Sequence, residues 1–222
     1  MRSLVIAPHP DDETLGVGGT IIKRKKNKSK VGLILVTEIK KNKKNFVSKS
    51  IKEKEIDQIK KKYNFDYFKR LNYPTTKLNS KNLKQLIDRF SKIFREFKPE
   101  EVFLPHADDT HSDHQIIFQA ISACTKKFRF PFVKKILSYE TLSETGYGIK
   151  PRKIRNNFYP NYYIDISPFF EKKIKILKIY KSEIKKHPFP RSLKSITSLA
   201  ILRGAESNCK YAEAFEVLKI YE

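Results

Sequence analysis

The sequence predicts an α/β fold, built on a mostly parallel sheet with helices on both faces. Short, nearly continuous apolar strands alternate with helices through roughly the first 125 residues, and this alternation is typical of a parallel sheet that helices cover on both sides. The chain has 222 residues, of which 39% are hydrophobic, and it contains no internal repeat or low-complexity linker. We therefore expect one domain that spans residues 1–222.

Strands and helices are expected in strict alternation over the first part of the chain. Apolar runs predict strands at 3–8, 31–37, 68–73 and 102–104, and helical spacing predicts helices at 14–25, 52–63, 83–97 and 112–125. The helix at 83–97 is the clearest, because its apolar side chains recur about every 3.6 residues and Pro99 follows it. Beyond this part, we expect strands at 136–139 and 162–166 and helices at 168–184 and 192–201.

Basic residues dominate the charge of the chain. The 47 lysines and arginines outnumber the 24 acidic residues and give a net charge of +23. Nucleic-acid binding, steering of an anionic substrate or membrane surface, and a merely solvated lysine-rich surface all fit such a charge. Lysines are spread along the whole chain, with runs such as 40–44, and no segment combines basic and aromatic residues into one binding face. We therefore favour the solvated surface and expect no specific nucleic-acid partner, while peripheral membrane contact and a phosphorylated substrate stay open.

The two cysteines and the N-terminal residues indicate the cellular compartment that we expect for the protein. Cys124 and Cys209 form no CxxC pair, and they fit reduced thiols in a cytosolic protein. The apolar run at 4–7 is too short for a signal peptide or a membrane span. A cytoplasmic location is therefore expected, and the oligomeric state, including a homo-oligomer, stays open.

Acidic and histidine side chains directly follow the first predicted strand. His9, Asp11, Asp12 and Glu13 lie there, and ligands of parallel sheets bind beyond the carboxyl ends of the strands. Helix capping explains one acid at such a place, but it explains a histidine with two aspartates less well. Because adjacent side chains in a turn point in different directions, one of Asp11 and Asp12 can bind a metal while the other faces a bound water.

A second polar segment, His111-Ser112-Asp113-His114, follows the fourth predicted strand. Ser112 and Gln115 fit the capping-box pattern, which predicts that a helix begins there. A lone histidine is more often structural or exposed than a ligand, but three of the five histidines lie in these two segments. Nearby His106 and Asp109 fit loop polarity as well as a supporting role around the ligands.

Together the two segments contain the donors of a catalytic metal site. A catalytic zinc takes three protein ligands and leaves one position for water, and His9, Asp12 and His114 supply two imidazoles and a carboxylate. Asp11 is then placed to remove a proton from that water, whose pKa the metal lowers to about 7. His111 can stabilise an oxyanion or protonate a leaving amine. The set suffices for metal-assisted amide hydrolysis, with iron(II) as an alternative to zinc.

Both segments resemble the motifs of a known family. Residues 7–13 read APHPDDE and are followed by Gly16 and Gly18-Gly19-Thr20, which is similar to the signature of the PIG-L/LmbE-like deacetylases. Residues 111–114 read HSDH and resemble the family's H-x-D-H motif. The resemblance covers nearly the whole chain. It implies a Rossmann-like fold and a zinc-dependent N-deacetylase that acts mostly on molecules containing N-acetylglucosamine.

The resemblance also implies a role for each matched side chain. The implied zinc ligands are His9, Asp12 and His114. Asp11 is implied as the general base, and His111 as the electrostatic stabiliser or acid, oriented by Asp113. The implied substrate contacts are Lys52, Glu140 and Arg191. Many relatives carry arginine where this chain has Lys52, and lysine keeps the charge but lacks the bidentate fork.

The expected function is that of a zinc-dependent hydrolase, which removes the N-acetyl group from an acetylamino sugar or its conjugate in glycan biosynthesis. The partner is expected to be a small molecule, and its carrier is left open among nucleotide, lipid and free glycoside. Two alternatives remain. One is a deacetylase of a small thiol-precursor glycoside, and the other is a non-catalytic basic module that binds nucleic acid or an anionic glycan.

Overall fold

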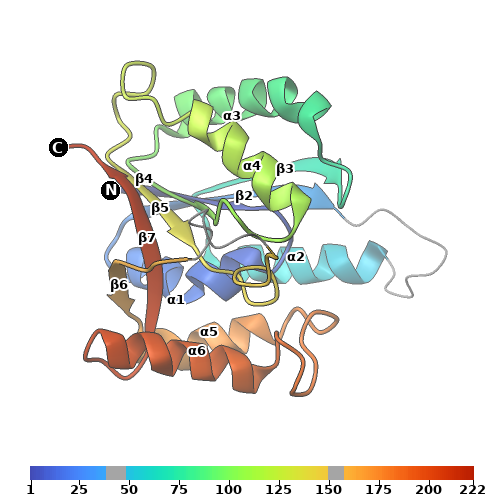
Figure 1. Cartoon of the computed structure of the whole chain (residues 1–222), viewed down its shortest axis with the longest axis vertical. Coiled ribbons are helices and arrows are strands. Elements are labelled where there is room, and N and C mark those ends of the chain that lie inside the picture. The colour runs from blue at the N-terminus through green and yellow to red at the C-terminus, as the bar shows by residue number, and fades with distance from the viewer. Residues whose placement is uncertain (39–48, 150–157) are drawn as a thin grey trace.

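A computed structural model describes residues 1–38, 49–149 and 158–222, and the lysine run at 40–44 lies outside them (Figure 1). The described strands are β1 (Arg2–Ala7), β2 (Lys30–Glu38), β3 (Tyr67–Pro74), β4 (Glu101–Pro105), β5 (Lys135–Tyr139), β6 (Tyr162–Asp165) and β7 (Ala212–Ile220). The described α-helices are α1 (Asp12–Lys26), α2 (Lys49–Tyr63), α3 (Leu83–Phe97), α4 (Ser112–Ala123), α5 (Phe170–Leu177) and α6 (Leu193–Glu206). Short 3-10 helices at Ser80–Asn82 and Ser167–Phe169 precede α3 and α5. None of the helices in the described ranges is long and apolar enough to span a membrane.

The described strands form one sheet in the order β3-β2-β1-β4-β5-β7-β6. β1 pairs in parallel with both β2 and β4, and the parallel part continues to β3 and β5. β7 runs antiparallel between β5 and β6. Because β1 and β4 are parallel neighbours, the polar segments that follow them emerge side by side at one edge of the sheet.

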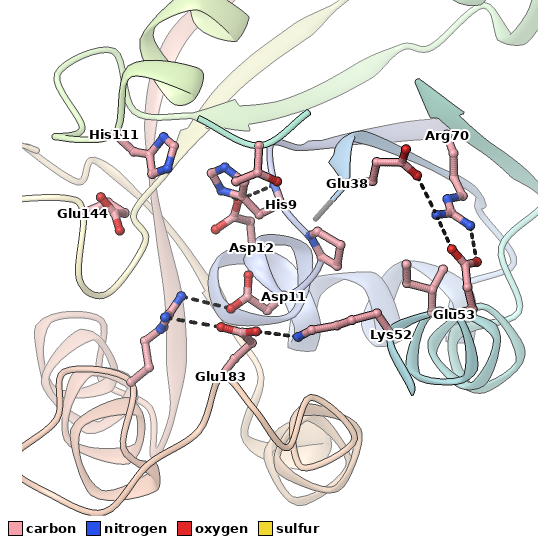
Figure 2. Close-up of a pocket in the computed structure, with 14 residues that line it drawn as sticks. His9, Asp11, Asp12, Glu38, Lys52, Glu53, Arg70, His111, Glu144 and Glu183 are labelled. Atoms are coloured by element: carbon pink, nitrogen blue, oxygen red, sulfur yellow. Dashed lines mark hydrogen bonds and ion pairs between the residues drawn. The ribbon is translucent and has the colours of Figure 1, made fainter. Parts of the chain in front are cut away.

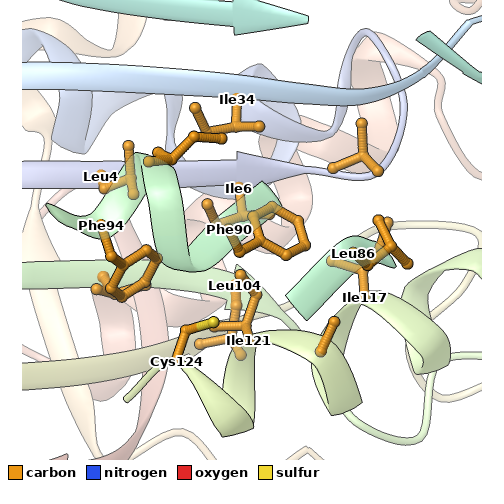
Figure 3. Packing of buried hydrophobic residues seen from close by; sticks show 14 of the residues in the cluster. Leu4, Ile6, Ile34, Leu86, Phe90, Phe94, Leu104, Ile117, Ile121 and Cys124 are labelled. Atoms are coloured by element: carbon orange, nitrogen blue, oxygen red, sulfur yellow. The ribbon is translucent and has the colours of Figure 1, made fainter. Parts of the chain in front are cut away.

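Helices cover both faces of this sheet (Figure 1). α3 and α4 lie on one face, and α1 and α2 lie on the other, with α5 and α6 on that second side. Leu4 and Ile6 of β1 join the core that includes α3 and α4 (Figure 3), whereas Val5 and Ala7 join the core on the opposite face. All four side chains are fully buried, since successive strand residues point to opposite faces. The predicted α/β fold with a mostly parallel sheet is confirmed.

Three elements differ from the sequence prediction. The helix predicted at 168–184 is wrong in extent, because only Phe170–Leu177 is α-helical and the chain then turns to bury the Tyr180 ring completely. The helix predicted at 192–201 continues to Glu206, after a start at which Ser192 accepts a hydrogen bond from Ser195 N–H. β7 is a strand that the sequence analysis does not predict, and it completes the sheet between β5 and β6.

Candidate active site

The chain turns sharply between β1 and α1. Asp11 has φ 128° and ψ −29°, a conformation that residues other than glycine rarely adopt. Glu13 helps to hold this turn, because its Oε2 accepts a hydrogen bond of 3.2 Å from Asp11 N–H. The turn separates two neighbouring carboxylates: Asp12 lies against the histidines, whereas Asp11 lies 3.2 Å from Arg191 Nη1.

The second polar segment starts α4 in a different way from the one predicted. His111 is the N-cap, and its Nδ1 accepts a hydrogen bond of 3.1 Å from Asp113 N–H. The predicted capping box that begins at Ser112 is therefore wrong, because Ser112 is already the first helical residue. This start places His114 in the first turn of α4, where its side chain is fully buried.

His9, Asp12 and His114 bring three donor atoms together at the ends of β1 and β4. His9 Nδ1 lies 3.2 Å from Asp12 Oδ2 and 3.3 Å from His114 Nε2, and His114 Nε2 lies 3.4 Å from Asp12 Oδ2. A tetrahedral zinc with bonds of about 2.0–2.1 Å holds its ligand atoms about 3.3–3.4 Å apart. The three donor atoms therefore fit three ligands of one tetrahedral ion, with the fourth position left for solvent or substrate.

Each of these histidines also contacts a carboxylate through its other ring nitrogen. Asp113 Oδ2 lies 3.2 Å from His9 Nε2, and Asp109 Oδ2 lies 2.7 Å from His114 Nδ1. Such carboxylates fix the tautomer and the orientation of imidazoles that bind metals. Asp109 had fitted loop polarity equally well in the sequence, and the structure places it directly behind a candidate ligand.

Asp113 lies closer to His9 than to His111. Its Oδ2 is 3.9 Å from His111 Nδ1, and its carboxylate also accepts hydrogen bonds from Thr76 N–H at 2.7 Å and Leu78 N–H at 3.2 Å. The cap bond from Asp113 N–H is what holds the His111 ring. Within the described chain, His9, His111 and Asp113 form a second group whose donor atoms lie within 4.8 Å of one another.

Burial and charge move the pKa values of this cluster in opposite directions. Burial lowers the pKa of both histidines, but hydrogen bonds and charges of neighbouring carboxylates outweigh it and raise the pKa of His9 to about 9 and that of His114 to about 10. The histidines hold the pKa of Asp12 far below its ordinary value despite burial. Burial and the charge of Asp12 raise the pKa of Asp11 well above its ordinary value. Two adjacent carboxylates thus differ in basicity, and Asp11 is the better proton acceptor.

A pocket of about 220 Å³ opens beside the metal-ligand candidates (Figure 2). Its lining includes six residues that the sequence analysis singled out: His9, Asp11, Asp12, Lys52, His111 and Arg191. Figure 2 shows His111 and Glu144 on one side of the pocket and Glu38, Glu53 and Arg70 on the other. Asp113 and His114 lie behind the lining and are fully buried.

Glu140 is the one predicted substrate residue that does not line this pocket. Its carboxylate accepts two hydrogen bonds of 2.8 Å from Arg203 Nε and Nη2. The pair borders a separate small hollow near α6. The structure therefore does not bring Glu140 together with the other predicted site residues.

Several charged residues line the pocket although no sequence motif marks them as site residues. Glu38 ends β2, Glu53 lies in α2, Arg70 lies in β3, and Glu183 follows α5. None belongs to a motif, and Glu183 falls in a stretch whose spacing predicts a continuous helix. Only the folded arrangement shows that they share one cavity.

A family model confirms the resemblance of the two motifs. The model described as PIG-L, GlcNAc-PI de-N-acetylase, matches residues 4–125, which is more than half of the chain. The chain belongs to the PIG-L family. This PIG-L protein is accordingly an enzyme of the N-deacetylase class of hydrolases.

Solved structures share the fold over almost the whole chain. N,N'-diacetylchitobiose deacetylase from Pyrococcus horikoshii is 23% identical with a TM-score of 0.77, over 98% of this chain and 83% of that one. The conserved protein TT1542 from Thermus thermophilus is 22% identical with a TM-score of 0.78, over 99% and 96%. GalB, a 4-carboxy-2-hydroxymuconate hydratase from Pseudomonas putida, is 15% identical with a TM-score of 0.76, over 100% and 99%. Because a hydratase shares this fold, the fold alone does not determine the reaction.

Proposed function

We propose that this PIG-L protein removes the acetyl group from the nitrogen of an acetylamino sugar or its conjugate. One observation carries the proposal: the donor atoms of His9, Asp12 and His114 lie 3.2–3.4 Å apart beside a pocket, with Asp11 on its wall. The family description, a de-N-acetylase of a sugar conjugate, points to the same chemistry.

Zinc is the proposed metal, and the ligands would be His9, Asp12 and His114. Two imidazoles and one carboxylate are typical of catalytic zinc, although iron(II) accepts the same donors. When bound, such an ion lowers the pKa of a water to about 7 and polarises a carbonyl oxygen. Asp109 and Asp113 would support the two histidine ligands from behind.

Asp11 would act as the general base. Burial and the charge of Asp12 raise the pKa of Asp11, which makes its carboxylate a stronger base toward the attacking water. Arg191 Nη1, at 3.2 Å from Asp11 Oδ2, fixes the direction of the carboxylate. As the C–N bond breaks, the amine nitrogen requires a proton, which Asp11 returns after taking it from the water. The products are acetate and a free amino sugar.

His111 would stabilise the negative charge that develops on the amide oxygen. Burial and the nearby histidines lower the pKa of His111, so its ring is neutral at pH 7. Its Nδ1 accepts the hydrogen bond from Asp113 N–H, which leaves the ring proton on Nε2. A neutral imidazole with a proton on Nε2 can donate a hydrogen bond to an oxyanion.

Glycan biosynthesis in the cytoplasm completes the proposal. The family description names a sugar joined to a carrier as the substrate, which is the chemistry of an intermediate in glycan assembly. Cys124 and Cys209 are both free thiols, and free thiols are typical of reducing compartments.

An acetate-release screen tests the proposed function. The zinc-reconstituted protein is incubated with N-acetylglucosamine, its methyl glycoside, a disaccharide, a nucleotide-linked form and an acetylated glycoside precursor of a small thiol. Acetate release from at least one sugar, abolished by chelation and restored by zinc, is expected. Stoichiometric zinc without acetate release from any substrate would rule the proposal out.

A further inference from the structure

The pocket is acidic, although the whole chain carries a net charge of +23. Of the described residues that line it, six have carboxylates and only three are lysine or arginine, and the acids still outnumber these cations when Asp12, whose charge the proposed zinc would offset, is left out. The carboxylates belong to Asp11, Asp12, Glu38, Glu53, Glu144 and Glu183. The cations belong to Lys52, Arg70 and Arg191.

Glu183 is paired with two of these three cations. Its Oε1 lies 2.5 Å from Lys52 Nζ, and its Oε2 lies 3.4 Å from Arg191 Nη2. Lys52 Nζ also lies 3.5 Å from Glu55 Oε2, and Arg191 Nη1 contacts Asp11. The lysine and the arginine that sequence analysis assigned to the substrate are therefore both neutralised within the protein.

The third cation is paired on the opposite wall. Arg70 donates to both carboxylate oxygens of Glu53, at 2.5 and 2.9 Å, and its Nη2 lies 3.6 Å from Glu38 Oε2. Figure 2 shows this group separated from the contacts of Glu183. Each cation in the described lining of the pocket thus already has a carboxylate partner.

This arrangement treats charged and neutral substrates differently. A phosphate in the pocket has to displace carboxylates from their cations while lying near the remaining acids. Charges within about 8 Å are only weakly screened at physiological salt, and a cleft lined by one sign of charge focuses its field. Like charges brought together oppose binding strongly. A neutral sugar instead donates hydrogen bonds from its hydroxyls to these carboxylates.

We infer that the pocket selects acetylamino sugars without a phosphate or carboxylate next to the reacting unit, and that Glu183 is a specificity-determining residue. This inference rests on the proposed deacetylase function and narrows its substrate class to neutral glycosides and oligosaccharides. Glu183 acts by holding Lys52 and Arg191, the cations that would otherwise be available to an anion.

A matched pair of substrates tests this inference. Methyl N-acetylglucosaminide and N-acetylglucosamine 1-phosphate differ at one position, and kcat/KM for acetate release is measured for both. The wild-type enzyme is expected to prefer the neutral glycoside by roughly tenfold or more. An equal or higher kcat/KM for the phosphate ester would overturn the inference but not the proposed function. No acetate release from either substrate would overturn the proposed function.

Variants that replace a carboxylate by an amide test which residue determines the preference for the neutral substrate. Glu183→Gln keeps the shape of the side chain and removes its charge, so it is expected to reduce the neutral preference roughly tenfold, mainly through a lower KM for the phosphate ester. Glu171→Gln removes the same charge from an exposed position of α5 and is expected to leave the preference unchanged. An unchanged preference in Glu183→Gln would contradict the assignment. If that variant does not fold, Glu53→Gln weakens the pairing of Arg70 on the opposite wall and is expected to reduce the neutral preference as well. An unchanged preference in Glu53→Gln would then contradict the inference that paired cations exclude anions from the pocket.

Discussion

Asp109 and His114 form a hydrogen bond of 2.7 Å between Oδ2 and Nδ1, and both side chains are fully buried. Thr145 Oγ1 donates to the other carboxylate oxygen of Asp109 at 2.6 Å. Asp109 therefore accepts a hydrogen bond from Nδ1 of His114, so that Nε2 faces His9 and Asp12 and can bind a metal once it has released its proton. The proposed metal site thus includes a supporting residue outside both sequence motifs.

Asp109→Asn is expected to weaken zinc binding by about 10- to 100-fold, because the amide holds the His114 ring less firmly and no longer stabilises it with a charge. Competition with a chromophoric chelator measures the affinity. Asp88→Asn changes an exposed aspartate of α3 and serves as the control. Equal zinc affinities in the two variants would show that Asp109 does not support the ligand.

Asp11→Asn is expected to keep its zinc and to lose activity. Removal of a general base lowers kcat by about 10²- to 10⁴-fold, whereas none of the three proposed ligand atoms belongs to Asp11. Metal analysis and kcat are measured on the same preparation. Asp57→Asn, at an exposed position of α2, controls for the loss of one carboxylate. A variant with normal kcat would refute the base assignment.

Zinc binding is expected to weaken as the pH falls below about 9. In the metal-free protein the pKa of His9 is raised to about 9 and that of His114 to about 10. Both rings are therefore doubly protonated and positively charged at neutral pH. A metal ligand has to be neutral imidazole, so binding releases up to about two protons and the affinity changes by up to about 100-fold per pH unit. Titration calorimetry in buffers of different ionisation enthalpy counts the protons. Absence of proton release near pH 7.5 would contradict this expectation.

Glu140→Gln is expected to lower stability and to leave KM unchanged. Glu140 and Arg203 make a bidentate pair with side chains only 14% exposed, so loss of the charge costs roughly 1–3 kcal/mol of unfolding free energy. Urea unfolding and steady-state kinetics separate the two effects. Glu206→Gln removes a more exposed partner of Arg203, 36% exposed, and is expected to cost only about 0–1 kcal/mol. A raised KM with normal stability would show instead that Glu140 contacts the substrate.

The meeting of the two histidine- and aspartate-containing segments could be predicted because the information is local. His9 and Asp12 follow one strand directly, and His111 and His114 follow another. Parallel strands bring such segments to one edge of a sheet, so their meeting follows from the fold class. The alternating strand and helix patterns predicted that fold class correctly.

The part of the pocket wall that Glu183 forms could not be predicted, because it depends on packing between distant elements. Residues 168–184 keep helical spacing after Pro168, with no glycine or further proline to mark an end. Tyr180 lies beyond the helix end, where its hydroxyl donates a hydrogen bond of 2.8 Å to the buried Glu13, and Glu183 follows it into the pocket lining. β7 was missed for a related reason, since its pairing partners on β5 lie far away in the sequence.

Anomalous diffraction from crystals of the zinc-reconstituted protein tests the metal centre most directly. The expected result is one zinc peak bonded to His9 Nδ1, Asp12 Oδ2 and His114 Nε2 at about 2.0–2.2 Å, with His111 outside the ligand set. A peak bonded instead to His9, His111 and Asp113 would contradict the proposed site and the roles assigned to Asp11 and His111.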